Sequence, residues 1–410
     1  MAARRVRNIV LPLLVFAAVL GAVELAVRAT LPHYSSRDFF LTLFGDPPDR
    51  TPRNQQPLFE GDPVLFWRLR PNVDRTIWDF TVVSTNEQGL RHPERIERKR
   101  PGTFRIVCLG DSVTFGYRIP LVFPDAPEQY DRDDAPYPRR LERLLRAEDP
   151  ARDVEVIALA VPGYSTHQGL LLLERWIDAL EPDLVIICFG FNDVSLKPSP
   201  DHVVMSRGFL PTVLRAVVSS SQALLHLWSW WANGPGAPPP GPPPRLQPRV
   251  PLERYVENIG AMVALAREHG AQVLVVGPVY RDPQTNPPEG RRMRLYRDTL
   301  RATMEASGVP YLEIAELTEA AHLGNALLFG EHIHPSSLGH QLMAERILAA
   351  LRRAGLLDAP SSSAPSAAAE RSSSGSALLQ DVDHAHAAAA HHVAEPRARI
   401  FHLTLARLAA

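Results

Sequence analysis

From residue 104 onward the chain alternates short apolar runs with stretches of helical spacing, and this alternation constrains its fold more than any other feature. The apolar runs, which we expect to be strands, are residues 105–109, 154–161, 184–189, 272–276 and 309–314. Helical spacing of apolar residues marks the intervening stretches, at residues 137–147, 166–180, 252–269, 291–307 and 337–354. Strands joined by helices of this length predict an α/β fold, a three-layer αβα sandwich with a five-stranded parallel sheet.

The predicted strands are almost entirely apolar, which is typical of a sheet covered by helices on both faces. Hydrophobic residues make up 45% of the chain and charged residues 22%, so a packed core is expected and wholesale disorder is excluded. In such sheets, sites form just beyond the carboxyl ends of the strands. The residues that follow each strand are therefore the candidates for chemistry.

Charge and cysteine content exclude several classes of function. The formal net charge is -1 and there is no basic excess, so no nucleic-acid partner is expected. The two cysteines, Cys108 and Cys188, lie inside predicted strands. They are too few for a disulfide framework and lack the spacing of zinc ligands, so we interpret them as small core residues.

The first segment, residues 1–31, has the pattern of a membrane-targeting sequence. Arg4, Arg5 and Arg7 precede an apolar stretch that begins at Ile9. Extended to residue 26, this stretch gives about 27 Å of helix, enough to cross the core of a bilayer. An uncleaved anchor and a cleaved signal peptide are both compatible with the pattern, and a buried globular helix is a third interpretation. In the first two cases the rest of the chain is exported, to the periplasmic or extracellular side.

The other predicted segments are an irregular lead-in at residues 32–102, the α/β domain at 103–357 and a low-complexity tail at 358–410, rich in Ala, Ser and His, which we expect to be disordered. Residues 195–251 form an insertion in the α/β domain. Its apolar stretch at 209–232 is compatible with a helix that covers its own domain or with a segment that enters a membrane surface.

A candidate nucleophile follows the first strand of the predicted sheet. Ser112 lies in the sequence Gly-Asp-Ser-Val-Thr-Phe-Gly, which presents a serine in a small turn. A serine needs a base to take its proton, and His334 precedes the last helix. Glu331 lies three residues upstream, so its carboxylate is placed to orient the imidazole of His334.

Two further strand ends supply donors for a developing oxyanion. Gly163 follows the second strand, where its N–H can approach a substrate closely, and Asn192 follows the third with a side-chain amide. The N–H of Ser112 is a further donor. Asp111 and Asp193 are interpreted as residues that brace the loops rather than as proton carriers.

These residues together resemble the SGNH/GDSL hydrolase superfamily over about residues 103–355. The Gly-Asp-Ser block matches the family's first block, which implies that Ser112 is the nucleophile and first oxyanion donor. Gly163 matches the second block, Asn192 the third and His334 the last. The resemblance implies a flavodoxin-like hydrolase fold and a serine esterase or acylhydrolase that needs no cofactor and no metal.

The last block departs from the family pattern. The family's sequence there is Asp-x-x-His, whereas this chain has Glu331 in place of the aspartate. Glutamate is one methylene longer, so a backbone carbonyl is an alternative orienter for His334. His332 is a competing base, but it has no carboxylate three residues upstream and no proline after it.

The main functional hypothesis is an exported serine hydrolase that cleaves small carboxylic esters through an acyl-enzyme. A second hypothesis keeps the same residues in an O-acyltransferase or acetylesterase that acts on acylated cell-envelope polysaccharide. A third is a non-catalytic binding module on the same fold. In the first two, the N-terminal segment supplies contact with a membrane.

Overall fold

The computed structural model describes most of the first 357 residues. The chain divides into two compact units, Met1–Leu357 and Asp358–Ala410. The predicted tail coincides with the second unit and lies outside the described residues. The described residues are 2–31, 33–34, 36–44, 58–123, 126, 129–206, 209–233, 245–280, 287–314 and 333–357.

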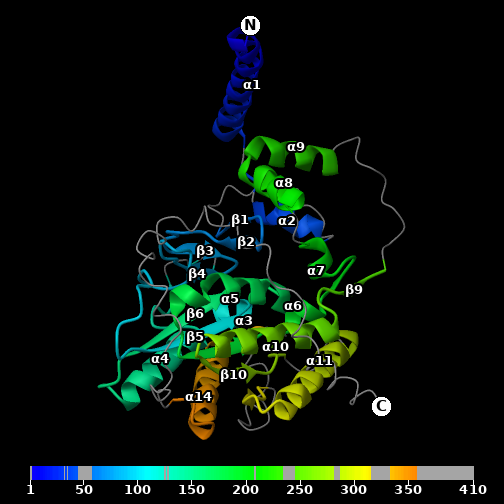
Figure 1. Ribbon diagram of the computed structural model, residues 1–410. Helices are drawn as coiled ribbons and strands as arrows, with labels where there is room; N and C mark the ends of the chain where they lie inside the picture. The colour runs from blue at the N-terminus through cyan, green and yellow to red at the C-terminus, as the bar shows by residue number, and fades with distance from the viewer. Residues whose placement is uncertain are drawn as a thin grey trace. The chain divides into compact units, whose positions relative to one another are not determined.

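The centre of the fold is a five-stranded sheet in the order β11-β10-β7-β5-β6 (Figure 1). Every neighbouring pair is parallel, which confirms the predicted fold class. Numbered along the chain, this order is 2-1-3-4-5, that of a flavodoxin-like doubly wound sheet. The strands are β5 (Phe104–Gly110), β6 (Val154–Ala160), β7 (Leu184–Cys188), β10 (Gln272–Val276) and β11 (Tyr311–Leu312).

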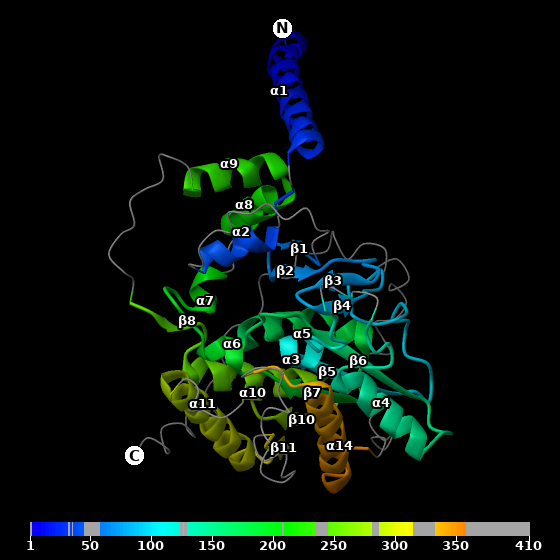
Figure 2. The ribbon, with the colours of Figure 1, turned by 180° about the vertical axis from the view of Figure 1, so that it is seen from behind.

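Helices cover both faces of this sheet (Figure 2). On β5, Val107 and Leu109 join the core on one face, whereas Ile106 and Cys108 join the core on the other. The first face packs against α5 (Thr166–Leu180), α10 (Leu252–Glu268) and α11 (Pro287–Ala306). The second packs against α4 (Tyr137–Glu148) and α14 (Ser337–Arg353). Both cysteines are buried and free, as expected of core residues.

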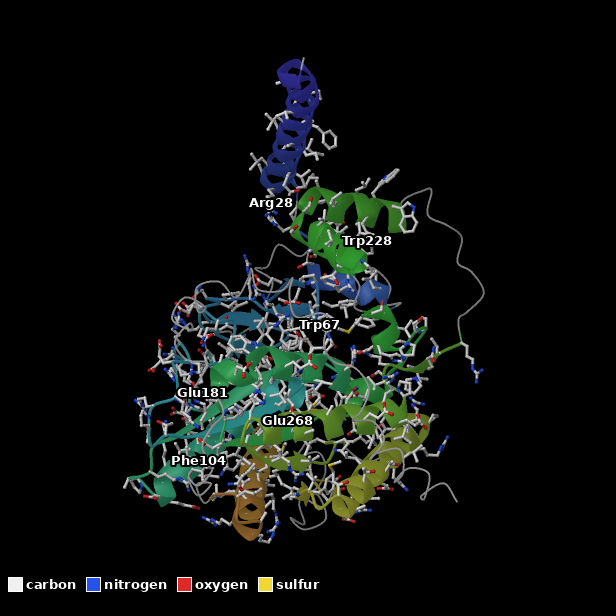
Figure 3. The ribbon with its side chains drawn as sticks, in the orientation of Figure 1. Arg28, Trp67, Phe104, Glu181, Trp228 and Glu268 are labelled. Atoms are coloured by element: carbon white, nitrogen blue, oxygen red, sulfur yellow. The ribbon has the colours of Figure 1, made fainter. Side chains whose placement is uncertain are left out.

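The lead-in is packed into the first of these cores. Trp67, labelled in Figure 3, is fully buried there. Its Nε1 donates to the carbonyl of Pro162, and its own carbonyl accepts from the Tyr164 hydroxyl. The lead-in therefore contacts the loop that carries Gly163. Its elements are α2 (Ser36–Leu43) and the antiparallel pairs β1 (Phe59–Asp62) with β2 (Phe66–Leu69) and β3 (Thr76–Trp78) with β4 (Thr81–Val83).

The insertion forms a short helix, α7 (Asp201–Val204), and two longer ones, α8 (Phe209–Ser220) and α9 (Gln222–Asn233). The apolar stretch is thus two helices, broken at Ser221, rather than one. The two ends of the insertion are joined by the antiparallel pair β8 (Leu196–Lys197) and β9 (Gln247–Pro248). Helix α8 contacts α2 and β1 of the lead-in.

The N-terminal helix α1 (Ala2–Thr30) is long and apolar enough to cross a membrane. Its candidate span, Val10–Thr30, has a mean hydropathy of 2.5 and none of it is buried against the protein. Helix α9 contacts α1. A buried globular helix, the third interpretation of this segment, does not fit this exposure.

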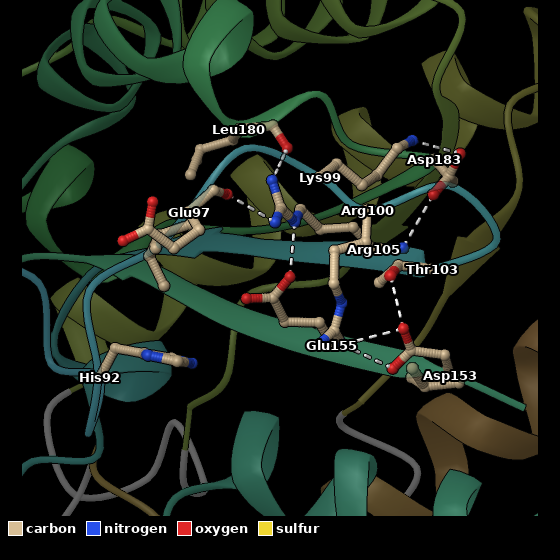
Figure 4. A network of polar contacts seen from close by, with 12 residues as sticks. His92, Glu97, Lys99, Arg100, Thr103, Arg105, Asp153, Glu155, Leu180 and Asp183 are labelled. Atoms are coloured by element: carbon tan, nitrogen blue, oxygen red, sulfur yellow. Dashed lines mark hydrogen bonds and ion pairs between the residues drawn. The ribbon is translucent and has the colours of Figure 1, made fainter. Parts of the chain in front are cut away.

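Polar contacts connect the amino ends of β5 and β6, at the opposite end of the strands from Ser112 (Figure 4). Arg105 is buried and donates to the Glu155 carboxylate (2.7 Å) and to the carbonyls of Leu180 and Glu97. Its backbone N–H donates to Asp183 (2.8 Å). A buried guanidinium is tolerated here because each of its donor groups has an acceptor.

Candidate active site

Ser112 and His334 meet at the carboxyl end of β5. The His334 Nε2 atom lies 2.8 Å from the Ser112 Oγ atom, a hydrogen-bonding distance between residues 222 positions apart in the chain. Ser112 opens the short helix α3 (Ser112–Phe115), and His334 lies shortly before α14. The pair therefore has the geometry that lets an imidazole take the proton of a hydroxyl.

The turn before Ser112 requires glycine at position 110. A Cβ atom there would lie 2.0 Å from Thr114 Oγ1 and 2.8 Å from the Cys188 carbonyl oxygen, both far inside van der Waals contact. Asp111 then caps α3, because its Oδ1 accepts a hydrogen bond from the Val113 N–H (2.9 Å). These local contacts turn the chain sharply enough to present Ser112 above the sheet.

Asn192 is held between two strand-end loops. It lies on the short helix α6 (Phe191–Val194), after β7. Its amide nitrogen donates to the carbonyl of Tyr164 at 3.0 Å and to Asp111 Oδ2 at 3.3 Å. The second bond is long, so one N–H of this amide can turn toward a substrate at small cost.

Burial raises the pKa of Asp111 to about 7, although hydrogen bonds from Val113 and Asn192 oppose the rise. Asp193, which follows Asn192, is fully buried, and its pKa is raised to about 7 mainly by the same loss of water. Its Oδ1 accepts from the N–H and hydroxyl of Thr166. Both carboxyls thus brace loops through hydrogen bonds, in agreement with their interpretation as bracing residues.

Gly163 has a positive φ of 85°, a conformation that favours glycine. A Cβ atom there would lie 3.3 Å from Trp67 Cζ2 and 3.6 Å from Arg37 Nη2. The lead-in therefore supplies the wall beside this glycine. On the other side of the peptide, the Gly163 carbonyl accepts from Arg249 Nη1 at 2.8 Å.

Arg249 belongs to a buried ion pair behind the Gly163 loop. Its guanidinium contacts both oxygens of Asp201, at 2.9 and 2.8 Å, and the side chain of Asp201 is fully buried. Asp201 also accepts from the Ser165 hydroxyl (2.6 Å), and Arg249 donates to Gln168 (2.9 Å). Because every partner is buried, this network holds the loop in one position.

The ring of His334 packs against Tyr117, with ring centroids 4.2 Å apart. The Tyr117 hydroxyl donates to Asp79 in the turn between β3 and β4. The lead-in thereby reaches the histidine as well as the glycine. Glu331 and His332 lie outside the described residues, so the predicted contact of Glu331 with the imidazole stays a prediction.

Arg91 fastens the lead-in to the segment that follows Ser112. It is half-buried, and its guanidinium donates to the carbonyls of Phe115 (2.5 Å), Gly116 (3.0 Å) and Ile119 (2.5 Å). Burial lowers the pKa of Arg91 to about 10, which leaves it charged at neutral pH.

Sequence reasoning did not identify Tyr117, Arg91 or Arg249 as site residues. Tyr117 directly follows the Gly-Asp-Ser block, which was a usable signal. Arg91 and Arg249 lie in segments without periodic pattern, and their roles depend on carbonyl groups that a sequence does not locate. Of the predicted residues, the structure joins Ser112 to His334 and links Asn192, through Asp111 and Tyr164, to the loops of Ser112 and Gly163.

A five-stranded parallel sheet covered by helices, with a polar site at the carboxyl ends of its strands, is the architecture of an α/β hydrolase. The profile of the GDSL-like lipase/acylhydrolase family matches residues 108–342, more than half of the chain, and the chain belongs to this family. It is an ester-hydrolysing enzyme, and the expected resemblance to SGNH/GDSL hydrolases is confirmed.

Part of the chain is similar to an arylesterase from Vibrio mimicus, with 31% identity over 102 residues. The match covers 25% of this chain and 44% of that relative's length. Among solved structures, LAE5, an alpha/beta hydrolase enzyme from the metagenome of Lake Arreo, is 19% identical and covers 62% of this chain and 96% of its own (TM-score 0.40). A catalytic mutant of Axe2, an acetylxylan esterase from Geobacillus stearothermophilus, is 17% identical over 62% and 95% (TM-score 0.40).

Proposed function

We propose that the chain hydrolyses small carboxylic esters with Ser112 as the nucleophile and His334 as its general base. The observation that carries this proposal is the 2.8 Å hydrogen bond between His334 Nε2 and Ser112 Oγ. In the first step, Oγ attacks the ester carbonyl carbon while Nε2 takes the hydroxyl proton. The protonated imidazole then gives that proton to the departing alcohol. Water, activated by the same nitrogen, releases the acid from the acyl-enzyme.

The oxyanion that forms in each step needs donors in place before the reaction. The donors in this proposal are the N–H groups of Ser112 and Gly163 and the side-chain amide of Asn192. The weak 3.3 Å contact of Asn192 with Asp111 is the one that the oxyanion replaces.

Glu331 is the proposed orienter of His334, since its position three residues upstream suits a contact with Nδ1. Exchange of Glu331 for glutamine keeps the size and removes the charge. We expect this variant to lower kcat more than KM, because the charge stabilises the imidazolium that exists only during the reaction. Unchanged kcat would favour a backbone carbonyl as the orienter.

The proposed nucleophile is tested with Ser112→Ala. We expect hydrolysis of short aryl esters to fall by at least a thousandfold and labelling by a fluorophosphonate probe to disappear. Ser307→Ala is the control, since Ser307 is an exposed serine just after α11 and outside the candidate active site. Retained labelling in Ser112→Ala would show that another residue is the nucleophile.

We further propose that α1 tethers the catalytic unit to a membrane, with residues after the helix on the exported side. The apolar span and the arginines before it support this orientation. A cleaved signal peptide is the competing possibility. Carbonate extraction followed by mass measurement separates the two, because only a retained anchor keeps the whole apolar span of α1 in the membrane-bound chain.

Acyl transfer to, or removal of acyl groups from, a cell-envelope polysaccharide is a second candidate. The observation that favours it is α1, which would hold the site close to the envelope. A sugar hydroxyl would take the place of water in the second step. Release of acetate and transfer of acetyl groups to added glycans, measured in parallel, distinguish the two activities.

A further inference from the structure

We propose that the helix pair α8–α9 docks in the surface of the lipid bilayer that α1 crosses. This inference rests on the proposed membrane tether. It assigns a partner to the insertion, which lies outside the candidate active site.

The exposed residues of α9 form an apolar stripe. Leu227 is 58% exposed, Trp230 65% and Trp231 59%. Their spacing of three and four positions places them on one face of the helix. Tryptophan is the side chain that most favours the boundary between lipid headgroups and acyl chains.

Helix α8 presents a second apolar stripe. Leu214 is 55% exposed and Val217 51%, again three positions apart. The two helices contain one charged residue, Arg215, which is itself buried and bonded to the carbonyls of Val204 and Ser206. The outer faces therefore carry no charge that would oppose contact with lipid.

The opposite face of α9 is already occupied by the protein. Leu225 is buried, and Trp228 packs edge-on against Phe39 of α2, with ring centroids 5.4 Å apart. The Ser229 hydroxyl donates to the Tyr34 hydroxyl. The exposed stripe is therefore the outer face of a helix whose inner face has its partners.

The position of this stripe beside α1 points to a bilayer as its occupant. Glu24 of α1 accepts hydrogen bonds from the N–H groups of Gln222 (2.9 Å) and Ala223 (3.0 Å) and from the Ser221 hydroxyl (2.8 Å). These N–H groups are the unpaired donors at the start of α9, which Glu24 caps. Arg28 pairs with Glu24 (2.6 Å) and donates to the Ser220 carbonyl (2.9 Å).

This polar contact, which we call the Glu24 latch, fixes α9 across the end of the apolar helix in both views (Figure 1, Figure 2). Leu25, beside the latch, is 69% exposed, so the apolar surface of α1 continues to the insertion. A bilayer crossed by α1 would meet the outer face of α9 at its headgroup region. The apolar helix α1 would lie among the acyl chains, and the tryptophans of α9 and the Glu24 latch would lie at the level of the headgroups, where such side chains are found in membrane proteins.

The test uses the full chain reconstituted in nanodiscs of phosphatidylcholine and phosphatidylglycerol. A polarity-sensitive fluorophore is attached to Leu227→Cys on α9 or to Leu295→Cys on α11, which is 54% exposed and serves as the control. The native Cys108 and Cys188 are buried, so the unsubstituted chain gives the labelling blank. Lipids with a nitroxide near the headgroup quench a fluorophore that lies in the interface.

We expect nitroxide lipids to reduce the Leu227→Cys signal at least threefold and to leave the Leu295→Cys signal unchanged. Equal quenching by the nitroxide lipids at the two positions would overturn the proposal. Glu24→Ala, which removes the latch, should weaken the quenching at position 227, whereas Glu24→Asp should preserve part of it.

Ester hydrolysis by the same reconstituted samples separates this inference from the proposed function. None of the substituted residues belongs to the candidate active site, so hydrolysis should remain. Loss of quenching with normal hydrolysis and carbonate-resistant membrane association would refute the docking of α8–α9 alone. A chain that leaves the membrane on carbonate treatment would refute both the tether and the docking.

Discussion

The ring of Tyr117 lies against the ring of His334, with centroids 4.2 Å apart and planes inclined by 39°. The Tyr117 hydroxyl donates to Asp79, so the β3–β4 hairpin of the lead-in holds the ring that packs against the histidine. A residue beside the nucleophile block thereby limits how far the imidazole can turn.

We predict that the ring of Tyr117, rather than its hydroxyl, positions His334. Tyr117→Ala should lower kcat by roughly threefold to tenfold, since an aromatic contact is worth about 0.5–1.5 kcal/mol. Tyr117→Phe keeps the ring and should stay within about threefold of the parent, because the bond to the exposed Asp79 contributes little. Steady-state kinetics on an aryl ester check both variants; equal losses would assign the effect to the hydroxyl.

Gly163→Ala should impair catalysis without unfolding the chain. Alanine at this position would have to adopt a φ of 85°, which costs about 1–3 kcal/mol, and its Cβ would lie close to Trp67. We expect kcat to fall at least tenfold as the donor N–H moves. Gly102→Ala is the matched control, because Gly102 has the same φ and open space around it. Similar kcat values for the two variants would exclude Gly163 as an oxyanion donor.

Removal of Arg249 should destabilise the protein strongly. Arg249→Met leaves the buried Asp201 without its cation, which costs about 3–5 kcal/mol. Arg249→Met combined with Asp201→Asn should regain part of this loss, as measured by denaturant unfolding. Arg98→Ala, which breaks an exposed ion pair with Glu181, should cost less than about 1 kcal/mol. A double variant no more stable than Arg249→Met would argue against an uncompensated charge.

Asp193 should make the protein less stable as pH rises toward and above neutrality. Its pKa is about 7 in the folded chain against an ordinary value of 3.8. The bound proton therefore stabilises the fold fully below about pH 4, and this contribution is lost as pH rises through about 7.

Asp193→Asn removes this titration and keeps an acceptor for the two donors of Thr166. We expect the difference in Tm between variant and parent to favour the variant more at pH 8.5 than at pH 5. Asp74→Asn, at an exposed position, should leave the pH profile of Tm unchanged. A constant difference across the range would mean that Asp193 does not titrate there.

The sequence predicted the strands and helices of the central sheet because their apolar patterns are long and regular. Strand β10 and helix α5 have the predicted bounds. Strand β11 is shorter than the predicted 309–314, since only Tyr311 and Leu312 pair with β10, although Val309 and Ile314 are buried. Helix α11 begins at Pro287, earlier than predicted, because proline is tolerated in a first helical turn.

The meeting of Ser112 with His334 could be expected because both follow the rule that places sites at the carboxyl ends of parallel strands. The residues that hold the site in place could not be predicted in this way. Tyr117 acts through a ring contact and Arg249 through a carbonyl oxygen, and neither leaves a period or spacing in the sequence. The break at Ser221 did leave a signal, since it falls in the polar run Ser219–Gln222 and serine is favoured just before a helix begins.

The contact between Trp67 and the 162–164 loop lies partly outside residues 108–342, which the family profile covers. A protein shortened to the residues that the family profile covers would lose the Trp67 ring beside Gly163. The Tyr164 hydroxyl would also lose the Trp67 carbonyl to which it donates. Chimaeras made with relatives must therefore exchange both partners of this contact together. Residues outside the shared domain and residues inside it are in this way bound to change in step.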